Sequence, residues 1–104
     1  MIEILEQRRE EIAELCREYG VEKLEVFGSA AGDSFDPVRS DIDFVVRFDY
    51  SRGVHGAAKR YFHLRNELSA LLGKSVDLVC EGAVKNPSFL KSLERSRTPI
   101  YAAA

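Results

Sequence analysis

The chain has 104 residues, of which 45% are hydrophobic and 31% charged, and its formal net charge is −2. This length and composition are typical of one soluble globular domain, so we expect a single domain over residues 1–104. The near-neutral charge argues against direct nucleic-acid binding through bulk positive charge. No apolar run approaches the ~20 residues of a membrane span, and the acidic start, MIEILEQRREE, does not resemble a signal peptide. We therefore expect a cytoplasmic protein with no membrane contact.

Helical and strand patterns alternate along the chain. Apolar residues at helical spacing predict helices over 2–19, 55–72 and 87–95. Alternating or short apolar runs predict strands over 22–27, 40–48 and 75–79, and 98–101 is either a last short strand or a tail. This order favours an α/β (α+β) fold, in which a small mixed β-sheet is flanked by helices.

The third predicted helix has a clear start signal. Asn86 followed by Pro87 is typical of an N-cap with proline at the first helical position. We expect this helix to bury Phe89, Leu90 and Leu93.

A Gly-Ser pair follows the first predicted strand. Gly28 would let the backbone approach a ligand closely. Ser29, at the mouth of a following helix, can offer its hydroxyl and its N–H to an anion. Such pairs are common in ordinary turns, so the pair gains meaning only from the acids that follow it.

Three acids on two strands are candidates for one metal site. Asp41 and Asp43 are two residues apart, which places them on one face of a strand. Asp77 lies in the middle of the next strand, where burial of an unpaired carboxylate would be expensive. If the strands are neighbours, the carboxylates converge into a hard-oxygen ligand set that suits Mg²⁺. Two such ions can clamp a nucleoside triphosphate.

Spacing alone leaves another interpretation open. Asp41 can be a loop cap, Asp43 an exposed strand residue and Asp77 a charge on an edge strand. The rival nucleotide and zinc motifs GxxxxGK[ST], GxGxxG and HExxH do not occur in the chain.

The motif FGS at 27–29, SDIDFVV at 40–46 and VDLV at 76–79 resembles the minimal nucleotidyltransferase (MNT) domains of the DNA polymerase β superfamily. It is similar to the antitoxin of HEPN/MNT toxin–antitoxin pairs. The resemblance implies a polymerase-β-like fold, with Gly28 and Ser29 at the nucleotide phosphates and Asp41 and Asp43 as Mg²⁺ ligands. Asp77 would be the third carboxylate, which binds metal and helps to activate the attacking hydroxyl.

The resemblance also implies a reaction and a partner. The reaction would be transfer of AMP from ATP to a hydroxyl, that of a tyrosine, on a HEPN-type toxin, with which the chain would form a hetero-oligomer. Two alternatives remain: an antitoxin that neutralises its toxin by binding alone, and a small-molecule nucleotidyltransferase. A chain of this length holds little beyond the catalytic core, so we expect either that the acceptor is another protein with its own docking surface or that a site forms across an oligomer.

The chain departs from the family pattern at one position. The family usually carries an arginine before its second glycine, as in GSxARG, and here Ala31 precedes Gly32. Arg39 and Arg47 are the candidates for a substitute charge.

Overall fold

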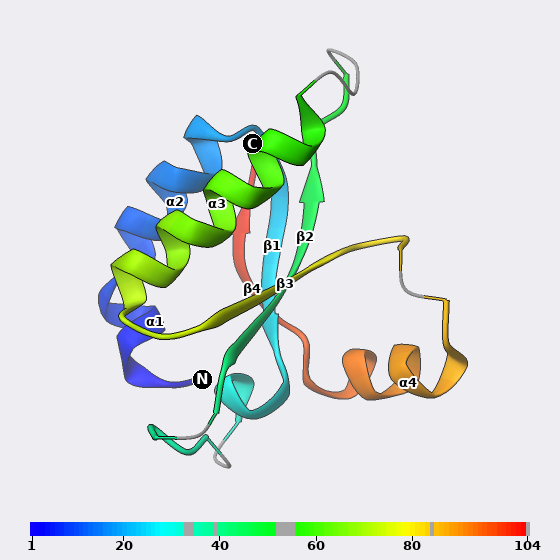
Figure 1. Ribbon diagram of the computed structural model, residues 1–104. Coiled ribbons are helices and arrows are strands. Elements are labelled where there is room, and N and C mark those ends of the chain that lie inside the picture. The colour runs from blue at the N-terminus through cyan, green and yellow to red at the C-terminus, as the bar shows by residue number, and fades with distance from the viewer. Residues whose placement is uncertain (33–34, 39, 52–55, 84, 104) are drawn as a thin grey trace.

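The structure is a computed structural model that describes residues 1–32, 35–38, 40–51, 56–83 and 85–103. Its centre is a four-stranded sheet with the strand order β3-β2-β1-β4 (Figure 1). The strands are β1 (Val21–Phe27), β2 (Ile42–Phe48), β3 (Val76–Cys80) and β4 (Thr98–Ala102). β1 lies antiparallel to β2 and β4, whereas β2 lies parallel to β3. The predicted mixed sheet is confirmed, and the segment after the last helix is a strand.

The helices of the described residues are α1 (Glu3–Gln7), α2 (Arg9–Glu18), α3 (Ala57–Leu72) and α4 (Pro87–Ser96), with a short 3₁₀ helix, η1 (Gly28–Ala31). The first predicted helix is divided in two at Arg8, whose backbone turns to φ −103° and ψ 15°. The Arg8 N–H still donates to the Ile4 carbonyl at 3.0 Å. The Arg8 carbonyl in turn accepts from the Ile12 N–H at 2.9 Å, so Arg8 is bonded to residues of both helices. None of these helices is long and apolar enough to cross a membrane.

The main core lies between one face of the sheet and the helices α1, α2 and α3. Alternate residues of β1 and β2 point into this core, because successive side chains of a strand point to opposite faces. The helices contribute one apolar side each, because apolar residues repeat along them at the spacing of a helical turn. The fully buried members of this core are Leu5, Ile12, Cys16, Leu24, Val26, Ala30, Ile42, Phe44, Leu64 and Leu68. Because Ile42 and Phe44 face this core, Asp43 between them faces the opposite side of the sheet.

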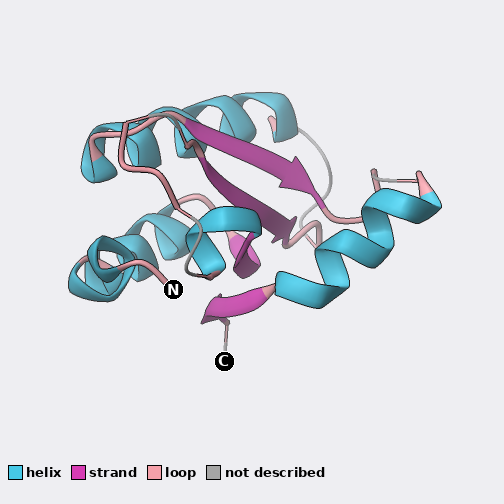
Figure 2. Ribbon diagram, turned by 90° about the horizontal axis from the view of Figure 1, so that it is seen from below, coloured by secondary structure: helices cyan, strands magenta, loops and turns pink. Residues whose placement is uncertain are grey.

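Helix α4 lies on that opposite side. Figure 2 shows the strands between α4 and the other helices. Leu93 of α4 is 3% exposed and packs with Phe27 and Val45 in a second, smaller cluster. The Asn86 side chain caps the helix by accepting from the N–H groups of Ser88 (2.9 Å) and Phe89 (3.3 Å), as predicted.

The prediction that α4 buries three apolar side chains is correct only for Leu93. Phe89 is 38% exposed and Leu90 is 39% exposed. The physical reason is the position of the helix, which meets the protein at η1 and β1 and leaves the rest of its surface open. A helical apolar stripe indicates which side chains can be buried, but not how much sheet they will meet.

Candidate active site

Two of the three candidate acids face each other across neighbouring strands. β2 and β3 pair in parallel with Asp43 opposite Asp77. Residues paired in this way project to the same face of a sheet, and here it is the face away from α2 and α3. Asp41 directly precedes β2 and is exposed. The fold therefore brings Asp43 and Asp77 together and leaves Asp41 at the entrance to the strand.

The acids affect one another electrostatically. Asp43 is half-buried, and burial raises the pKa of its carboxyl group above the ordinary value. The negative charges of Asp77 and, to a smaller extent, Asp41 raise this pKa further. A cation placed among these groups would relieve the repulsion.

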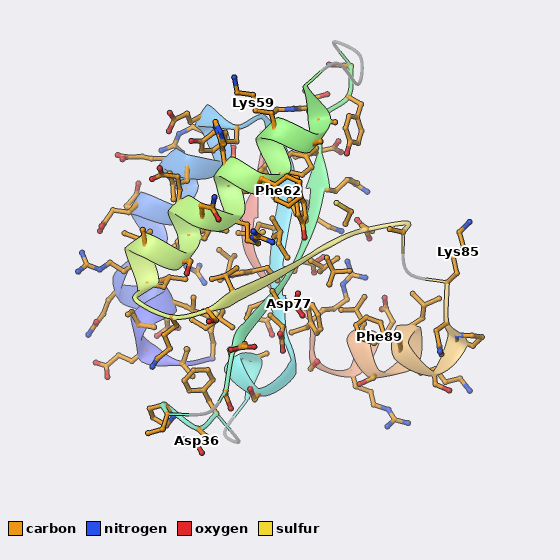
Figure 3. The ribbon with its side chains drawn as sticks, viewed as in Figure 1. Asp36, Lys59, Phe62, Asp77, Lys85 and Phe89 are labelled. Atoms are coloured by element: carbon orange, nitrogen blue, oxygen red, sulfur yellow. The ribbon has the colours of Figure 1, made fainter. Side chains whose placement is uncertain are left out.

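Asp77 is exposed, contrary to the expectation that it would carry a burial cost. The reason is that Asp77 lies on the face of the edge strand β3 opposite the helix-covered core, whereas its neighbour Leu78 points into that core and is 3% exposed. Figure 3 shows Asp77 on β3 at the centre of the molecule, with Phe89 on α4 to its lower right. This exposure also fits the alternative interpretation, in which Asp77 is only a surface charge on an edge strand. That interpretation gives no reason for Asp77 to lie directly opposite Asp43, as it does.

The Gly-Ser turn lies directly against Asp43. Phe27, at the end of β1, pairs with Asp43, and Gly28 is the next residue. Gly28 has φ +70°, a left-handed conformation that side chains rarely adopt. A Cβ atom at this position would lie 2.8 Å from Oδ2 of Asp43. Glycine is therefore needed at position 28 both for the backbone conformation and for the close approach to the acid.

The turn is held from the N-terminal side as well. The Ile2 N–H donates to the Ala30 carbonyl at 2.9 Å, and the Ala30 side chain is fully buried. The Gly32 N–H donates to the Ser29 carbonyl at 3.2 Å, which closes η1. Ser29 thus occupies a fixed position between the strand and the buried Ala30.

There is open space at Gly32, next to the position of the missing arginine. Gly32 is exposed, and a Cβ at this position would meet nothing within 4 Å. Arg39 lies outside the described residues. Arg47 shares the Asp43 face of β2, but its guanidinium is paired with Glu22 (2.7 Å) and lies 3.9 Å from Glu81. Arg47 is therefore engaged elsewhere on the sheet.

Sequence reasoning missed a second group of residues on the same face. The Gly28 N–H donates to Oγ of Ser96 at the end of α4 (3.0 Å). The next residue, Arg97, binds Glu25, which is only 6% exposed, and also contacts Glu81 at 3.1 Å. The hydrogen bond from Arg97 lowers the pKa of Glu25. Glu25, an acid inside an apolar strand, was a signal for a buried partner, but its partner lies 72 positions away.

The side of the sheet that carries Asp43 and Asp77, with Asp41 just before β2, is here called the acid face, and its carboxylate oxygens are donors that suit Mg²⁺. In the described part of the chain, no three His, Cys, Asp or Glu side chains are gathered as a metal site. Asp43 and Asp77 instead form an open pair of oxygen donors with the charge of Asp41 nearby. Because Mg²⁺ keeps several waters and takes phosphate oxygens as ligands, an open pair fits an ion that arrives with a nucleotide.

Comparison with known proteins identifies the family. The family model described as "Nucleotidyltransferase domain" matches residues 8–100. The chain belongs to the nucleotidyltransferase domain family. Its class of activity is therefore nucleotidyl transfer, and the predicted resemblance and enzyme class are confirmed.

Individual relatives agree with this assignment. The nucleotidyltransferase is 40% identical over 84 residues to "Putative protein adenylyltransferase MJ0128" of Methanocaldococcus jannaschii, across 77% of this chain and 76% of that protein. A solved structure described as a "putative minimal nucleotidyltransferase" matches with a TM-score of 0.73 and 30% identity, over 94% of this chain and 96% of the other.

A more distant match concerns the fold alone. It is to a chain of a complex between a tri-AMPylated HEPN toxin of Shewanella oneidensis and an MNT antitoxin, with a TM-score of 0.62 and 18% identity. That match covers 95% of this chain and 73% of the other chain. It confirms the predicted α+β nucleotidyltransferase-like fold.

Proposed function

We propose that this nucleotidyltransferase transfers AMP from ATP, with Mg²⁺, to a tyrosine hydroxyl of a HEPN-type toxin and thereby acts as its antitoxin. The observation that carries the proposal is the close approach of the Gly28 turn to Asp43, which is itself in register with Asp77. A phosphate-binding turn and an acid pair that share one open face are the two parts that nucleotidyl transfer needs.

Each site residue has a role in this proposal. Asp41 and Asp43 hold Mg²⁺, and Asp77 supplies the third carboxylate. Gly28 and Ser29 bind the nucleotide phosphates: the glycine has no side chain and lets a phosphate approach the turn closely, and the serine offers its hydroxyl and its N–H. When bound, Mg²⁺ would neutralise the charge on the triphosphate and on the acids.

The bond changes follow from this arrangement. The oxygen of the acceptor hydroxyl forms a bond to the α-phosphorus of ATP, and the bond from that phosphorus to the bridging oxygen breaks. Pyrophosphate leaves with the electron pair, and the hydroxyl proton passes to the Asp77 carboxylate. Because Asp77 is exposed on an edge strand, a tyrosine from another protein can reach it from solvent.

The nature of the acceptor is supported by the relatives. The Methanocaldococcus relative carries the name of a protein adenylyltransferase. The Shewanella complex pairs an MNT antitoxin with a HEPN toxin that bears AMP. We therefore favour a protein acceptor over a small molecule.

The direct test uses ATP labelled at the α-phosphate, the purified chain and a HEPN-type toxin that it binds. We expect label on a toxin tyrosine, located by mass spectrometry, and no label with the Asp41→Asn/Asp43→Asn double variant. Asp36→Asn is the matched control. Asp36 is an exposed acid outside the acid face, and Asn can still accept the Val38 N–H that Asp36 binds at 2.9 Å.

Two results would contradict the proposal. If the double variant neutralises the toxin as well as the wild type does, the antitoxin acts by contact alone. If label appears only on a small-molecule hydroxyl, the chain is a small-molecule nucleotidyltransferase.

A further inference from the structure

Helix α4 is attached by three contacts to the turn formed by Gly28 and Ser29 and to Phe27 just before it. The Gly28 N–H donates to Oγ of Ser96 at 3.0 Å. The ring of Phe27, one residue earlier, meets the ring of Phe89 edge-on with centroids 5.8 Å apart. Leu93, between Phe89 and Ser96 on the helix, packs against Phe27 as well. Residues from the first turn of α4 to its last therefore contact the end of β1 and the turn that follows it.

The Ser96 hydroxyl is oriented to accept from Gly28. It donates its own hydrogen to the Ser92 carbonyl one helical turn earlier, at 3.4 Å. This leaves its lone pairs for the Gly28 N–H. Since the Gly28 amide is occupied by Ser96, the hydroxyl and N–H of Ser29 are the groups of the pair that we assign to phosphate binding.

The end of α4 is fixed on the far side of Ser96 by an ion network. Arg97 uses its guanidinium to bind Glu25 on β1, Glu81 after β3 (3.1 Å) and Glu94 on α4 itself (2.7 Å). Arg97 and Glu25 are both largely buried, so this network is a stronger constraint than a surface pair. Ser96 is thus held between the apolar contact of Leu93 and the ion network of Arg97.

We propose that Ser96 is a positioning residue for nucleotide binding. By accepting the Gly28 N–H, it fixes the turn in the conformation that presents Ser29 to the phosphates and keeps Gly28 against Asp43. This inference rests on the proposed function, because it assigns the turn to the phosphates of ATP. It makes the position of α4, a helix that supplies none of the three candidate acids, a determinant of nucleotide affinity.

The test compares Ser96→Ala with Ser96→Thr and with Ser92→Ala. Ser92 lies one turn earlier on the same helix and is exposed, so Ser92→Ala makes the same substitution without loss of the Gly28 contact. We expect Ser96→Ala to raise KM for ATP about three- to tenfold, the effect of one lost hydrogen bond. Its kcat should change less, Ser96→Thr should restore KM, and Ser92→Ala should behave as wild type.

Hydrogen exchange of the Gly28 amide, followed by NMR, is a second readout that needs no nucleotide. We expect this amide to exchange faster in Ser96→Ala than in wild type or in Ser92→Ala. If KM and Gly28 exchange in Ser96→Ala equal those of Ser92→Ala, the inference is overturned. Loss of thermal stability in Ser96→Ala with KM unchanged would also overturn it, because the role would then be structural.

Failure of the proposed function would look different. A wild-type chain that transfers no AMP from ATP to any acceptor refutes that function. Gly28 exchange then decides the remaining question: faster exchange in Ser96→Ala supports Ser96 as the residue that sets the turn, and unchanged exchange rejects it.

Discussion

Gly28→Ala is expected to disturb both the backbone of the turn and the position of the Asp43 carboxylate. Alanine at position 28 is unfavourable for two reasons. Its backbone would have to hold φ +70°, and its Cβ would lie 2.8 Å from Oδ2 of Asp43, closer than real Cβ contacts allow. The backbone can tolerate the strain at a cost, but the Asp43 side chain must move away. We therefore expect a loss of stability and a separate loss of the acid geometry.

The two effects have different magnitudes and different readouts. A non-glycine residue in the left-handed region costs roughly 1–2 kcal/mol. For a domain of this size, that corresponds to a fall in Tm of about 4–16 °C. Displacement of Asp43 should remove most of the additional stabilisation that Mg²⁺ and ATP provide.

Two glycines of the same chain provide matched controls. Gly73 also has a positive φ, +65°, but a Cβ there would meet nothing within 4 Å, so Gly73→Ala carries strain alone. Gly32 has a negative φ and equally open surroundings, so Gly32→Ala carries neither effect. In thermal unfolding with and without ATP and Mg²⁺, Gly73→Ala should lose stability but keep the ligand shift. If Gly28→Ala keeps the full ligand shift, the reasoning about Asp43 is wrong.

Three further substitutions test the electrostatics and the packing. Asp43→Asn should raise the Tm of the ion-free protein at neutral pH. The pKa of Asp43 is raised in the folded protein, so the stability of the wild type falls as the pH rises through that pKa, and asparagine carries no such charge. An unchanged Tm would count against the charge repulsion. Glu25→Gln should make the stability of the protein depend less on pH in the acid range. The pKa of Glu25 is lowered by its bond to Arg97, so the stabilisation from this pair is lost as the pH falls through that pKa. An identical stability–pH profile would show that the pair does not contribute to the pH dependence of stability. Leu93→Ala should cost about 2–5 kcal/mol in denaturant unfolding, since Leu93 is buried against the sheet, and a cost near zero would mean that α4 is not docked in solution.

The parts of the site that could be predicted from the sequence depend on short-range periodicity. The spacing of Asp41 and Asp43 predicted that they share one face of a strand, and the apolar Ile42 and Phe44 alternate with them; in the structure Ile42 and Phe44 are buried in the core and Asp43 is not. A glycine placed between an apolar strand and Ser29 indicated a turn where the backbone comes close to another group. These inferences need only the geometry of one element.

The parts that could not be predicted depend on contacts between distant segments. The bond between Gly28 and Ser96 joins residues 68 positions apart, and no local pattern indicates it. The exposure of Phe89 depends on how much of the sheet α4 covers, which a helical stripe does not specify. The exposure of Asp77 depends on the place of β3 at the sheet edge and on which of its faces the helices cover, and neither follows from the sequence of β3.

Thermal unfolding in Mg²⁺ and ATP, on wild type, Asp43→Asn and Asp36→Asn, is the most direct measurement of whether the acid face binds a metal–nucleotide complex. A ligand at about 100 times its Kd should stabilise the folded state by roughly 2.7 kcal/mol. We expect this stabilisation in wild type and in Asp36→Asn, and little or none in Asp43→Asn. Equal shifts in all three proteins, or no shift in any of them, would contradict the assignment of these acids to nucleotide binding.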